Sequence, residues 1–226
     1  MSLAVPSDLV GNTTGSPPTP LVVGVAGGSG SGKSTVTNGV RSELHGRVTV
    51  ESIDMDAYYH HLAHLTPEAR KLVNWDHPDA LDLELLADHL GTLKLGGAVD
   101  KPVYDYVNHL RLEQTVHVEP AEVIFVDGIL LFASERVRSL CDIRVYVDTD
   151  ADLRLIRRIR RDMTVRGRPL EEILDQYLAT VRPMHLEFVE PGREHAHLVV
   201  PGSDHSDLAV SLVLNEVMRH LELHEA

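Results

Sequence analysis

The sequence predicts a three-layer α/β fold with a mainly parallel central sheet. The runs LVVGVA at 21–26 and VIFV at 123–126 are short and almost wholly apolar, as expected of strands buried on both faces. Segments with apolar residues at helical spacing, such as 81–94 and 208–221, alternate with runs of this kind. Strands that alternate with helices form a parallel sheet with helices on both faces, because each crossover returns the chain to the same sheet.

The elements follow one another in a regular order. LVVGVA leads into a glycine-rich loop and then into a helical candidate, STVTNGVRSEL. A β-hairpin is expected at about 97–119, where VYDYV and TVHV are two extended pieces, and Thr66 is a candidate N-cap for a short helix. The remaining predicted elements are strands at 47–53, 143–147 and 197–200 and helices at about 150–163 and 170–188.

Composition limits the classes of function that are open to this chain. Its 226 residues include 34 acidic and 21 basic side chains, and the net charge of −13 argues against general nucleic-acid binding. One cysteine, Cys141, cannot form an internal disulfide, so we expect a reducing, cytoplasmic location, with Cys141 half-buried before a strand. No apolar run reaches about 18 residues, so no membrane span is expected.

The predicted domain organisation is simple. Residues 1–20 are rich in Ser, Thr, Gly and Pro and are expected to form a disordered tail. Residues 21–222 are expected to form a single domain, and 223–226 a short C-terminal tail.

The strongest functional signal is GGSGSGKS at 27–34. It fits the pattern G-x-x-x-x-G-K-[ST] at Gly27, Gly32, Lys33 and Ser34, with an apolar strand before it and a helical pattern after it. Glycines let backbone N–H groups curl around phosphate oxygens, Lys33 reaches the outer phosphates, and the Ser34 hydroxyl binds Mg²⁺. The predicted nucleotide-binding residues are Gly27, Gly28, Ser29, Gly30, Ser31, Gly32, Lys33, Ser34 and Thr35.

Aspartates follow two of the predicted strands. Asp127 ends the strand VIFV, where it could hold Mg²⁺ directly or through water, or simply begin a turn before Gly128. Asp54 and Asp56 follow the strand at 47–53, and by position either could accept a proton from an acceptor hydroxyl. Turn chemistry is the alternative for both, because aspartate favours such bends.

Six arginines occur in the thirteen residues IRRIRRDMTVRGR, 156–168. In a chain that binds nucleotide, mobile arginines can cover the charge of a phosphoryl group as a lid, here at about 157–170. Arg158 and Arg161 share a helix face, and Arg166 and Arg168 flank a candidate hinge at Gly167. The alternative, a solvated helix face, is expected to hold for Arg154, Arg157 and Arg160.

The sequence resembles the uridine (uridine–cytidine) kinases, a family of P-loop nucleoside kinases. The motifs that carry this resemblance occur in the family's order, from about Leu21 to Pro201, and as a set they are highly specific. They are GGSGSGKST, DAYY, NWDHPDALD, PVYDYVNH, DGILLF, VDTDADLRLIRRIRRD, RGR, QY and VRPMHLEFVEP.

The resemblance implies a role for individual residues. Asp56, before the aromatic pair of DAYY, is implied to be the base, and Asp76 of WDHPD is implied to hold the ribose hydroxyls. His109 is implied to read the base, and a neutral imidazole can serve both uracil and cytosine because it carries one donor and one acceptor. The other implied substrate contacts are Tyr59, Tyr104, Tyr106, Arg158, Arg168 and Gln176, and Arg158, Arg161 and Arg166 match the phosphate-facing lid. For the tyrosines, packing in the hairpin core is the alternative.

The resemblance also implies an activity, phosphoryl transfer from ATP or GTP with Mg²⁺ to the 5′-hydroxyl of uridine or cytidine, by a homotetramer. Three departures from the family pattern stand out: Asp127 where Glu is common, PGSDHSD at 201–207 near the expected donor base, and His197 where Asp is common. Two other functions stay open. One is a kinase of another acceptor, phosphoribulokinase-like or pantothenate-kinase-like, and the other is a nucleotide-binding regulator without catalysis.

Overall fold

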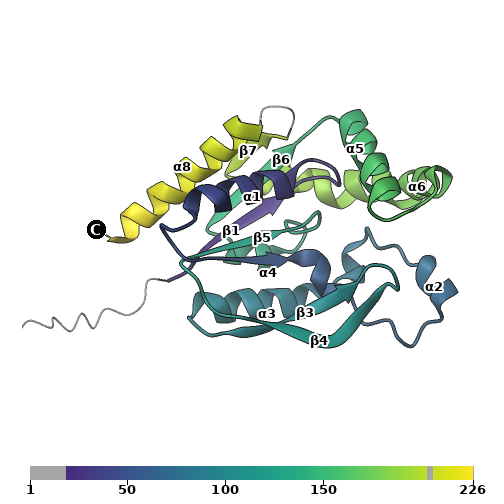
Figure 1. Cartoon of the computed structure of the whole chain (residues 1–226), viewed down its shortest axis with the longest axis horizontal. Helices are drawn as coiled ribbons and strands as arrows, with labels where there is room; N and C mark the ends of the chain where they lie inside the picture. Colours follow the sequence, from purple (N-terminus) through teal and green to yellow (C-terminus); the bar gives the residue numbers. More distant parts are fainter. Residues whose placement is uncertain (1–18, 203–205, 226) are drawn as a thin grey trace, which may run out of the picture.

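The computed structural model describes residues 19–202 and 206–225 (Figure 1). Its centre is a five-stranded, all-parallel sheet in the order β2-β5-β1-β6-β7. The strands are β1 (Leu21–Ala26), β2 (Val50–Asp54), β5 (Val123–Asp127), β6 (Ile143–Asp148) and β7 (Leu198–Pro201). The predicted hairpin is present as a separate antiparallel pair, β3 (Val99–Asp105) and β4 (Leu110–Val118).

Helices cover both faces of the sheet, which confirms the predicted three-layer α/β fold. Helices α1 (Lys33–Leu44) and α8 (Ser206–Glu225) pack together on one face, and α3 (Leu83–Lys94) and α4 (Glu135–Leu140) pack together on the other (Figure 1). Helices α5 (Ala151–Thr164) and α6 (Leu170–Gln176) lie beyond the end of the sheet, and α2 (Pro67–Lys71) lies beyond the hairpin. Thr66 caps α2 as predicted, its Oγ1 accepting from the N–H of Ala69.

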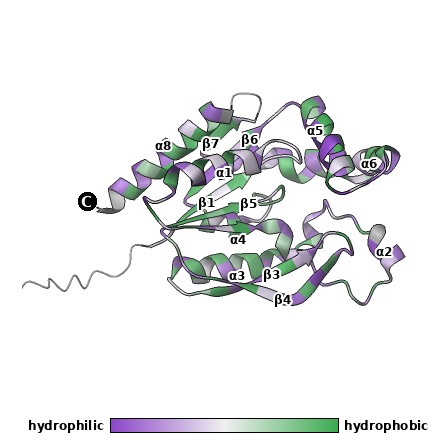
Figure 2. Cartoon of the chain, in the orientation of Figure 1, coloured by the Kyte–Doolittle hydropathy of each residue, from purple (hydrophilic) through white to green (hydrophobic). Residues whose placement is uncertain are grey.

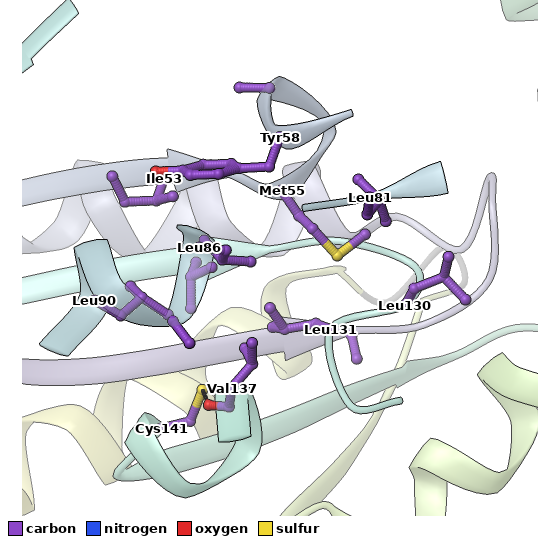
Figure 3. Close-up of a cluster of buried hydrophobic side chains, with 14 of the residues drawn as sticks. Ile53, Met55, Tyr58, Leu81, Leu86, Leu90, Leu130, Leu131, Val137 and Cys141 are labelled. Atoms are coloured by element: carbon purple, nitrogen blue, oxygen red, sulfur yellow. Dashed lines mark hydrogen bonds between the residues drawn. The ribbon is translucent and has the colours of Figure 1, made fainter. Parts of the chain in front are cut away.

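The central strands bury both of their faces, which explains their continuous apolar runs (Figure 2). In β1, Val23 and Val25 point to the core under α1 and α8, whereas Val22 and Ala26 point to the core under α3 and α4. This alternation is the two-residue period of a strand. Figure 3 shows the second of these cores, where Leu86 and Leu90 of α3 meet Leu131 and Val137.

The strand predicted at 47–53 and the helix predicted at 170–188 differ from the expected elements. Strand β2 begins at Val50 and not at 47, because Arg47 and Val48 donate their N–H groups back to Leu44 O and close the end of α1. The predicted helix at 170–188 is not a uniform α-helix. Helix α6 is followed by π-helical turns at Tyr177–Val181 (η3) and His185–Val189 (η4), on either side of the short helix α7 (Arg182–Met184). Pro183 in α7 lacks the N–H that an unbroken α-helix would need there.

Shorter helical turns complete the chain. The 3₁₀ turns are η1 (Met55–Tyr58), η2 (Pro78–Ala80) and η5 (Glu190–His195). Helix α8 continues to Glu225, so it includes most of the residues expected to form the tail 223–226. The sulfhydryl of Cys141 is fully buried and not half-buried, because it packs under α4 beside Phe132. No helix in the described ranges is both long and apolar enough to cross a membrane. The expected N-terminal tail lies almost wholly outside the described residues.

Candidate active site

A cavity of about 540 Å³ lies at the carboxyl ends of β1, β2 and β5, between the hairpin and the arginine segment (157–168). It brings together nearly all of the candidate residues. Those that line it are Ser29, Gly30, Gly32, Lys33, Ser34, Thr35, Asp56, Tyr59, Asp76, Tyr104, Tyr106, His109, Asp127, Arg158, Arg161, Arg166, Arg168 and Gln176. Gly27, Gly28 and Ser31 lie in the same loop, outside the lining of the cavity.

The glycine-rich loop joins β1 to α1. Gly30 and Gly32 have φ angles of 80° and 99°, a region in which a side chain would strain the backbone. Lys33 folds back across this loop, its Nζ donating to Gly27 O at 2.9 Å and to Gly28 O at 3.1 Å. Burial lowers the pKa of Lys33 to about 8, although the nearby carboxylates of Asp127 and Asp56 act in the opposite direction.

Three carboxyl groups meet opposite Lys33. Asp54 and Asp127 end adjacent parallel strands and are partners in the strand register, and Asp56 follows two residues after Asp54. Burial and the charge of Asp54 raise the pKa of Asp56 to about 7, and the same two causes raise the pKa of Asp127 to about 6. These are the shifts expected of like charges that share a buried site.

The chemistry of this group suits Mg²⁺. The Ser34 hydroxyl and the Asp127 carboxylate both border the cavity, and hard divalent cations prefer oxygen ligands of these kinds. A cation there would also relieve the mutual repulsion that raises the pKa values of the carboxyl groups. The residues present therefore fit the predicted metal.

Asp54 stabilises the turn that follows β2. Its Oδ1 accepts from the N–H of Asp56 at 2.9 Å and so begins η1, while Oδ2 accepts from the Tyr106 hydroxyl at 3.2 Å. Asp56 itself has its carboxyl group free of such capping bonds. The two aspartates, equal by sequence position, thus differ in structure: Asp54 fixes the turn and Asp56 faces Lys33.

Aromatic rings form the side of the cavity next to the hairpin. The Trp75 indole and the His109 imidazole are stacked, with ring centres 5.2 Å apart and planes 13° from parallel. Tyr59 lies against both Trp75 and Tyr104, at 5.3 and 5.0 Å between ring centres, and its hydroxyl donates to Trp75 O. Tyr59 and Tyr104 are buried in this cluster, so they pack in the core of this region as well as bordering the cavity. Tyr106 is half-exposed, and core packing does not account for it.

Asp76 is a buried carboxyl group that enters the cavity. It accepts a hydrogen bond of 2.9 Å from Thr180 Oγ1, and Thr180 in turn lies one helical turn after Gln176. Burial raises the pKa of Asp76. The largest effect in the opposite direction is the positive charge of Arg158, which lowers this pKa.

The arginine segment is organised by a residue that the sequence reasoning did not single out. Asp162 is fully buried, and its Oδ1 lies 2.9 Å from Arg161 Nε and 3.5 Å from Arg166 Nη1. Its Oδ2 lies 3.6 Å from Arg168 Nη1 and 3.7 Å from Arg158 Nε. One carboxylate therefore gathers four guanidinium groups at the edge of the cavity.

Hydrogen bonds connect this segment to both sides of the cavity. Arg158 donates to Ser29 Oγ at 3.0 Å and to Gln176 Oε1 at 3.2 Å, and Arg168 donates to the same Gln176 oxygen at 2.7 Å. The Arg166 guanidinium lies 5.7 Å from the centre of the Tyr106 ring, in cation–π contact with the hairpin.

The solvated-face prediction was wrong for two of three arginines. Arg154 is buried and donates to Thr149 O, and Arg157 donates to Gly202 O at 2.6 Å and borders the cavity. Arg160 is exposed, as expected. Arg154 and Arg157 lie on the side of α5 that packs against the glycine-rich loop. Because arginines occur on several sides of this helix, the sequence does not indicate which side is buried.

Three further features were missed or undervalued. Trp75 was read only as part of a motif, although an aromatic residue directly before a predicted binding aspartate was a usable signal. Asp162 interrupts a run of arginines at i+4 from Arg158, which is the spacing of a helical ion pair. Ile129 borders the cavity from the loop after β5, and the sequence analysis included it only as part of the motif DGILLF.

Comparisons with known proteins identify the family of this chain. The profile of the Phosphoribulokinase / Uridine kinase family matches residues 22–209. The uridine kinase of Limosilactobacillus reuteri is 48% identical over 198 residues, which cover 88% of this chain and 90% of that protein. The uridine kinase of Bacillus subtilis is 44% identical over 203 residues, which cover 90% of this chain and 96% of that protein.

A solved structure shares the fold at lower sequence identity. Phosphoribulokinase from Rhodobacter spheroides superposes with a TM-score of 0.59 and 17% identity, over 82% of this chain and 73% of that chain. At this identity the likeness concerns the fold alone, and it confirms the predicted P-loop kinase architecture. The family profile spans most of the chain, and the two relatives align over nearly all of it. The chain therefore belongs to the phosphoribulokinase/uridine kinase family.

Proposed function

We propose that this protein is a uridine kinase, which transfers the γ-phosphoryl group of ATP or GTP to the 5′-hydroxyl of uridine or cytidine. One observation carries the proposal: the Asp56 carboxyl group lies in one cavity with a phosphate-binding loop on one side and an aromatic, Asp76-containing pocket on the other. Phosphoryl transfer to a hydroxyl requires a base that lies between the phosphate donor and the acceptor, within reach of the hydroxyl proton. The relatives named uridine kinase support the choice of acceptor.

The glycine-rich loop binds the phosphates of the donor in this proposal. Its N–H groups and the N-terminus of α1 surround the phosphate oxygens, and Lys33 exchanges its contacts with Gly27 O and Gly28 O for contacts with the outer phosphates. Ser34 and Asp127 would hold Mg²⁺, which would supply positive charge to offset the negative charge of the donor phosphates.

Asp56 acts as the base. It takes the proton of the 5′-hydroxyl as the bond from O5′ to the γ-phosphorus forms. The bond from the γ-phosphorus to the β-phosphate oxygen breaks at the same step and releases ADP or GDP. Its raised pKa suits this task, because a base with a pKa near neutral pH is about half ionised there and is a better proton acceptor than an ordinary carboxylate. Asp54 and the hairpin residue Tyr106 fix the turn that carries it.

The acceptor binds against the aromatic side of the cavity. Asp76 accepts hydrogen bonds from the ribose 2′- and 3′-hydroxyls, and Thr180 orients its carboxylate. His109 reads the base as a neutral imidazole, since burial and the neighbouring arginines lower its pKa. Tyr59, Tyr104, Tyr106, Arg168 and Gln176 complete the pocket, with Trp75 stacked behind His109.

The arginine segment covers the phosphoryl group during transfer. Arg161 and Arg166 face the phosphates and offset the negative charge spread over the equatorial oxygens. Arg158 contacts both the glycine-rich loop and Gln176, so it is suited to closing the two halves of the site together. Closure excludes water, which would otherwise accept the phosphoryl group.

Asp76→Asn is expected to lower kcat/KM for uridine by about 10- to 100-fold, because hydrogen bonds to a charged group contribute roughly 1.5–3 kcal/mol. The same variant should change kcat/KM for 2′-deoxyuridine less, since that nucleoside makes one hydrogen bond fewer. Steady-state kinetics with both nucleosides measure the difference. Asp79→Asn is the matched control, as Asp79 is close in sequence and its side chain is 90% exposed. Equal losses for the two nucleosides would contradict the ribose assignment.

Asp127→Asn is expected to raise the Mg²⁺ concentration for half-maximal activity by about tenfold or more, because the amide is a neutral and weaker ligand for a hard cation. Activity titrated with Mg²⁺ at fixed ATP measures this. Asp142→Asn is the control, since that carboxylate pairs with Lys94 away from the cavity. An unchanged Mg²⁺ requirement in Asp127→Asn would remove this residue from the metal site.

The experiment that tests the proposed function measures ADP release from Mg²⁺-ATP with four acceptors in turn, uridine, cytidine, ribulose 5-phosphate and pantothenate, and without any acceptor. Release that depends on uridine or cytidine supports the proposal. Release with another acceptor would keep the fold and overturn the pocket assignment. If no ADP is released with any acceptor, and no GDP when the experiment is repeated with Mg²⁺-GTP, the result would favour the non-catalytic regulator. Cytoplasmic location and the homotetramer stay predictions, and the second is checked by sedimentation of the purified protein.

A further inference from the structure

Helix α5 divides its arginines between two tasks. Arg158 and Arg161 border the cavity, but Arg154, one turn earlier, is buried beneath the glycine-rich loop and does not line the cavity. The motif VRPMHLEFVEP at 181–191 also has no part in the proposed mechanism. The structure joins these two unused features, because His185 of that motif lies against Arg154 and Glu190 lies against His185.

We propose that Arg154, His185 and Glu190 form a cluster that positions the glycine-rich loop for the donor phosphates, with His185 as the positioning residue that fixes the Arg154 guanidinium. The proposal rests on the proposed function only in that this loop binds a nucleotide. It does not depend on which acceptor is used.

Arg154 touches the loop at several points. A Cβ placed on Gly28 would contact Arg154 Nη1 and lie 3.0 Å from its Cδ and Cζ, so the guanidinium packs directly on that residue. A Cβ on Gly30 would lie 2.5 Å from the Arg154 carbonyl oxygen. Arg154 Nε also donates to Thr149 O at 3.0 Å, and Thr149 Oγ1 donates to Ser31 O at 2.9 Å. The loop therefore rests on Arg154 and its immediate neighbours.

His185 fixes the other end of the guanidinium. Its Nε2 lies 3.1 Å from Arg154 Nη2 and 3.0 Å from Glu190 Oε2. A ring nitrogen of a neutral imidazole either donates or accepts, so the contact with Arg154 requires Nε2 to accept and places the ring proton on Nδ1. The other nitrogen, Nδ1, is buried without a hydrogen-bond partner among the described residues. Burial and Arg154 lower the pKa of His185, which keeps the imidazole neutral at pH 7. The contact between His185 and Arg154 is therefore made by Nε2 alone.

This arrangement matters for phosphate binding in two ways. A buried guanidinium behind the loop adds fixed positive charge on the side opposite the phosphates, where low polarity strengthens it. Without the contact to His185, the Arg154 guanidinium can rotate away from Gly28. The glycine-rich loop then loses the packing contact that stabilises its conformation. Both effects act on the donor site and leave the acceptor pocket, on the hairpin side of the cavity, unaltered.

The test compares His185→Gln with His185→Asn. Both side chains are neutral amides, but glutamine places its amide at the position of Nε2, whereas asparagine places it at the position of Nδ1. We expect His185→Gln to stay within about twofold of the parent protein and His185→Asn to raise the dissociation constant for Mg²⁺-AMPPNP, a non-hydrolysable ATP analogue, about tenfold. Calorimetry measures this binding without any acceptor, so the result stands even if the uridine assignment fails.

Two further readouts separate positioning from general damage. In the kinase assay KM for ATP should rise in His185→Asn while KM for uridine stays within about twofold. Equal affinities for the nucleotide analogue in the two variants, or equal rises in both KM values, would overturn the proposal. If His185→Asn does not fold, as judged by circular dichroism, Arg154→Lys takes its place, since it keeps the charge and removes the contact with Nε2. Nucleotide affinity must then fall, and unchanged affinity would overturn the proposal equally.

Discussion

Asp56→Asn is expected to lower kcat for uridine phosphorylation by about 10³-fold or more, with uridine affinity changed only a few-fold. General base catalysis contributes typically about 10²–10⁴-fold, and an amide cannot accept the 5′-hydroxyl proton. The substitution keeps the size of a half-buried side chain that borders the cavity with Lys33, so the pocket should retain its shape. Single-turnover kinetics and a separate binding measurement with uridine distinguish the loss of chemistry from a loss of binding.

Asp54→Asn is the matched control for this prediction. Asp54 lies two residues away in the same turn, and asparagine can still accept from Asp56 N through Oδ1 while its Nδ2 donates to Tyr106 Oη. We expect it to retain at least about a tenth of the parent kcat. If Asp56→Asn keeps as much activity as Asp54→Asn, Asp56 is not the base.

Asp162→Asn is expected to lower the free energy of unfolding by about 3–5 kcal/mol, because removal of one partner from a buried ionic group leaves uncompensated charge. Four guanidinium groups lie within 3.7 Å of its carboxylate oxygens. The Asp162 carbonyl also accepts from Arg168 N at 3.0 Å, so the loop that carries Arg166 and Arg168 is fixed at the same point. In a protein of this size the melting temperature should fall by roughly 6–20 °C.

Asp152→Asn provides the comparison on the same helix. Asp152 is exposed and lies in the first turn of α5, so its neutralisation should change stability by less than about 1 kcal/mol. Urea unfolding of the two variants measures both values. A similar, small change in each would contradict the view that Asp162 organises the arginine segment.

Sequence patterns predicted the fold well because each central strand satisfies local rules. The runs at 21–26 and 123–126 are buried on both faces, and continuous apolar character is the direct consequence. The helix predicted at 170–188 shows the limit of this approach. Its apolar spacing is helical, but the π-helical turns beside Pro183 depend on how the backbone compensates for one missing N–H, and apolar periodicity does not carry that information.

The cavity lining was predictable where a motif defines it. Lys33 and Ser34 follow from a short pattern whose spacing reflects a local geometry, and Asp76 follows from the resemblance to the family. The tasks within the arginine segment were not predictable from charge alone. Arg154, Arg157 and Arg161 have the same side chain, and only the packing of α5 against the loop decides which one is buried, which contacts Gly202 and which faces the cavity. The i±4 spacing of Asp162 from Arg158 and Arg166 was a usable signal, but its full burial among four guanidinium groups is visible only in three dimensions.

The most direct test of the central claim is the identity of the product made from uridine and Mg²⁺-ATP by the parent protein, followed by ³¹P NMR. The account predicts one new phosphomonoester resonance, coupled to the two 5′ protons, that coincides with added uridine 5′-monophosphate and grows in step with ADP. Asp56→Asn at the same concentration should leave that resonance undetectable over the same time. A phosphoester at another ribose position, or ADP formed without any nucleotide product, would contradict the assignment of the site.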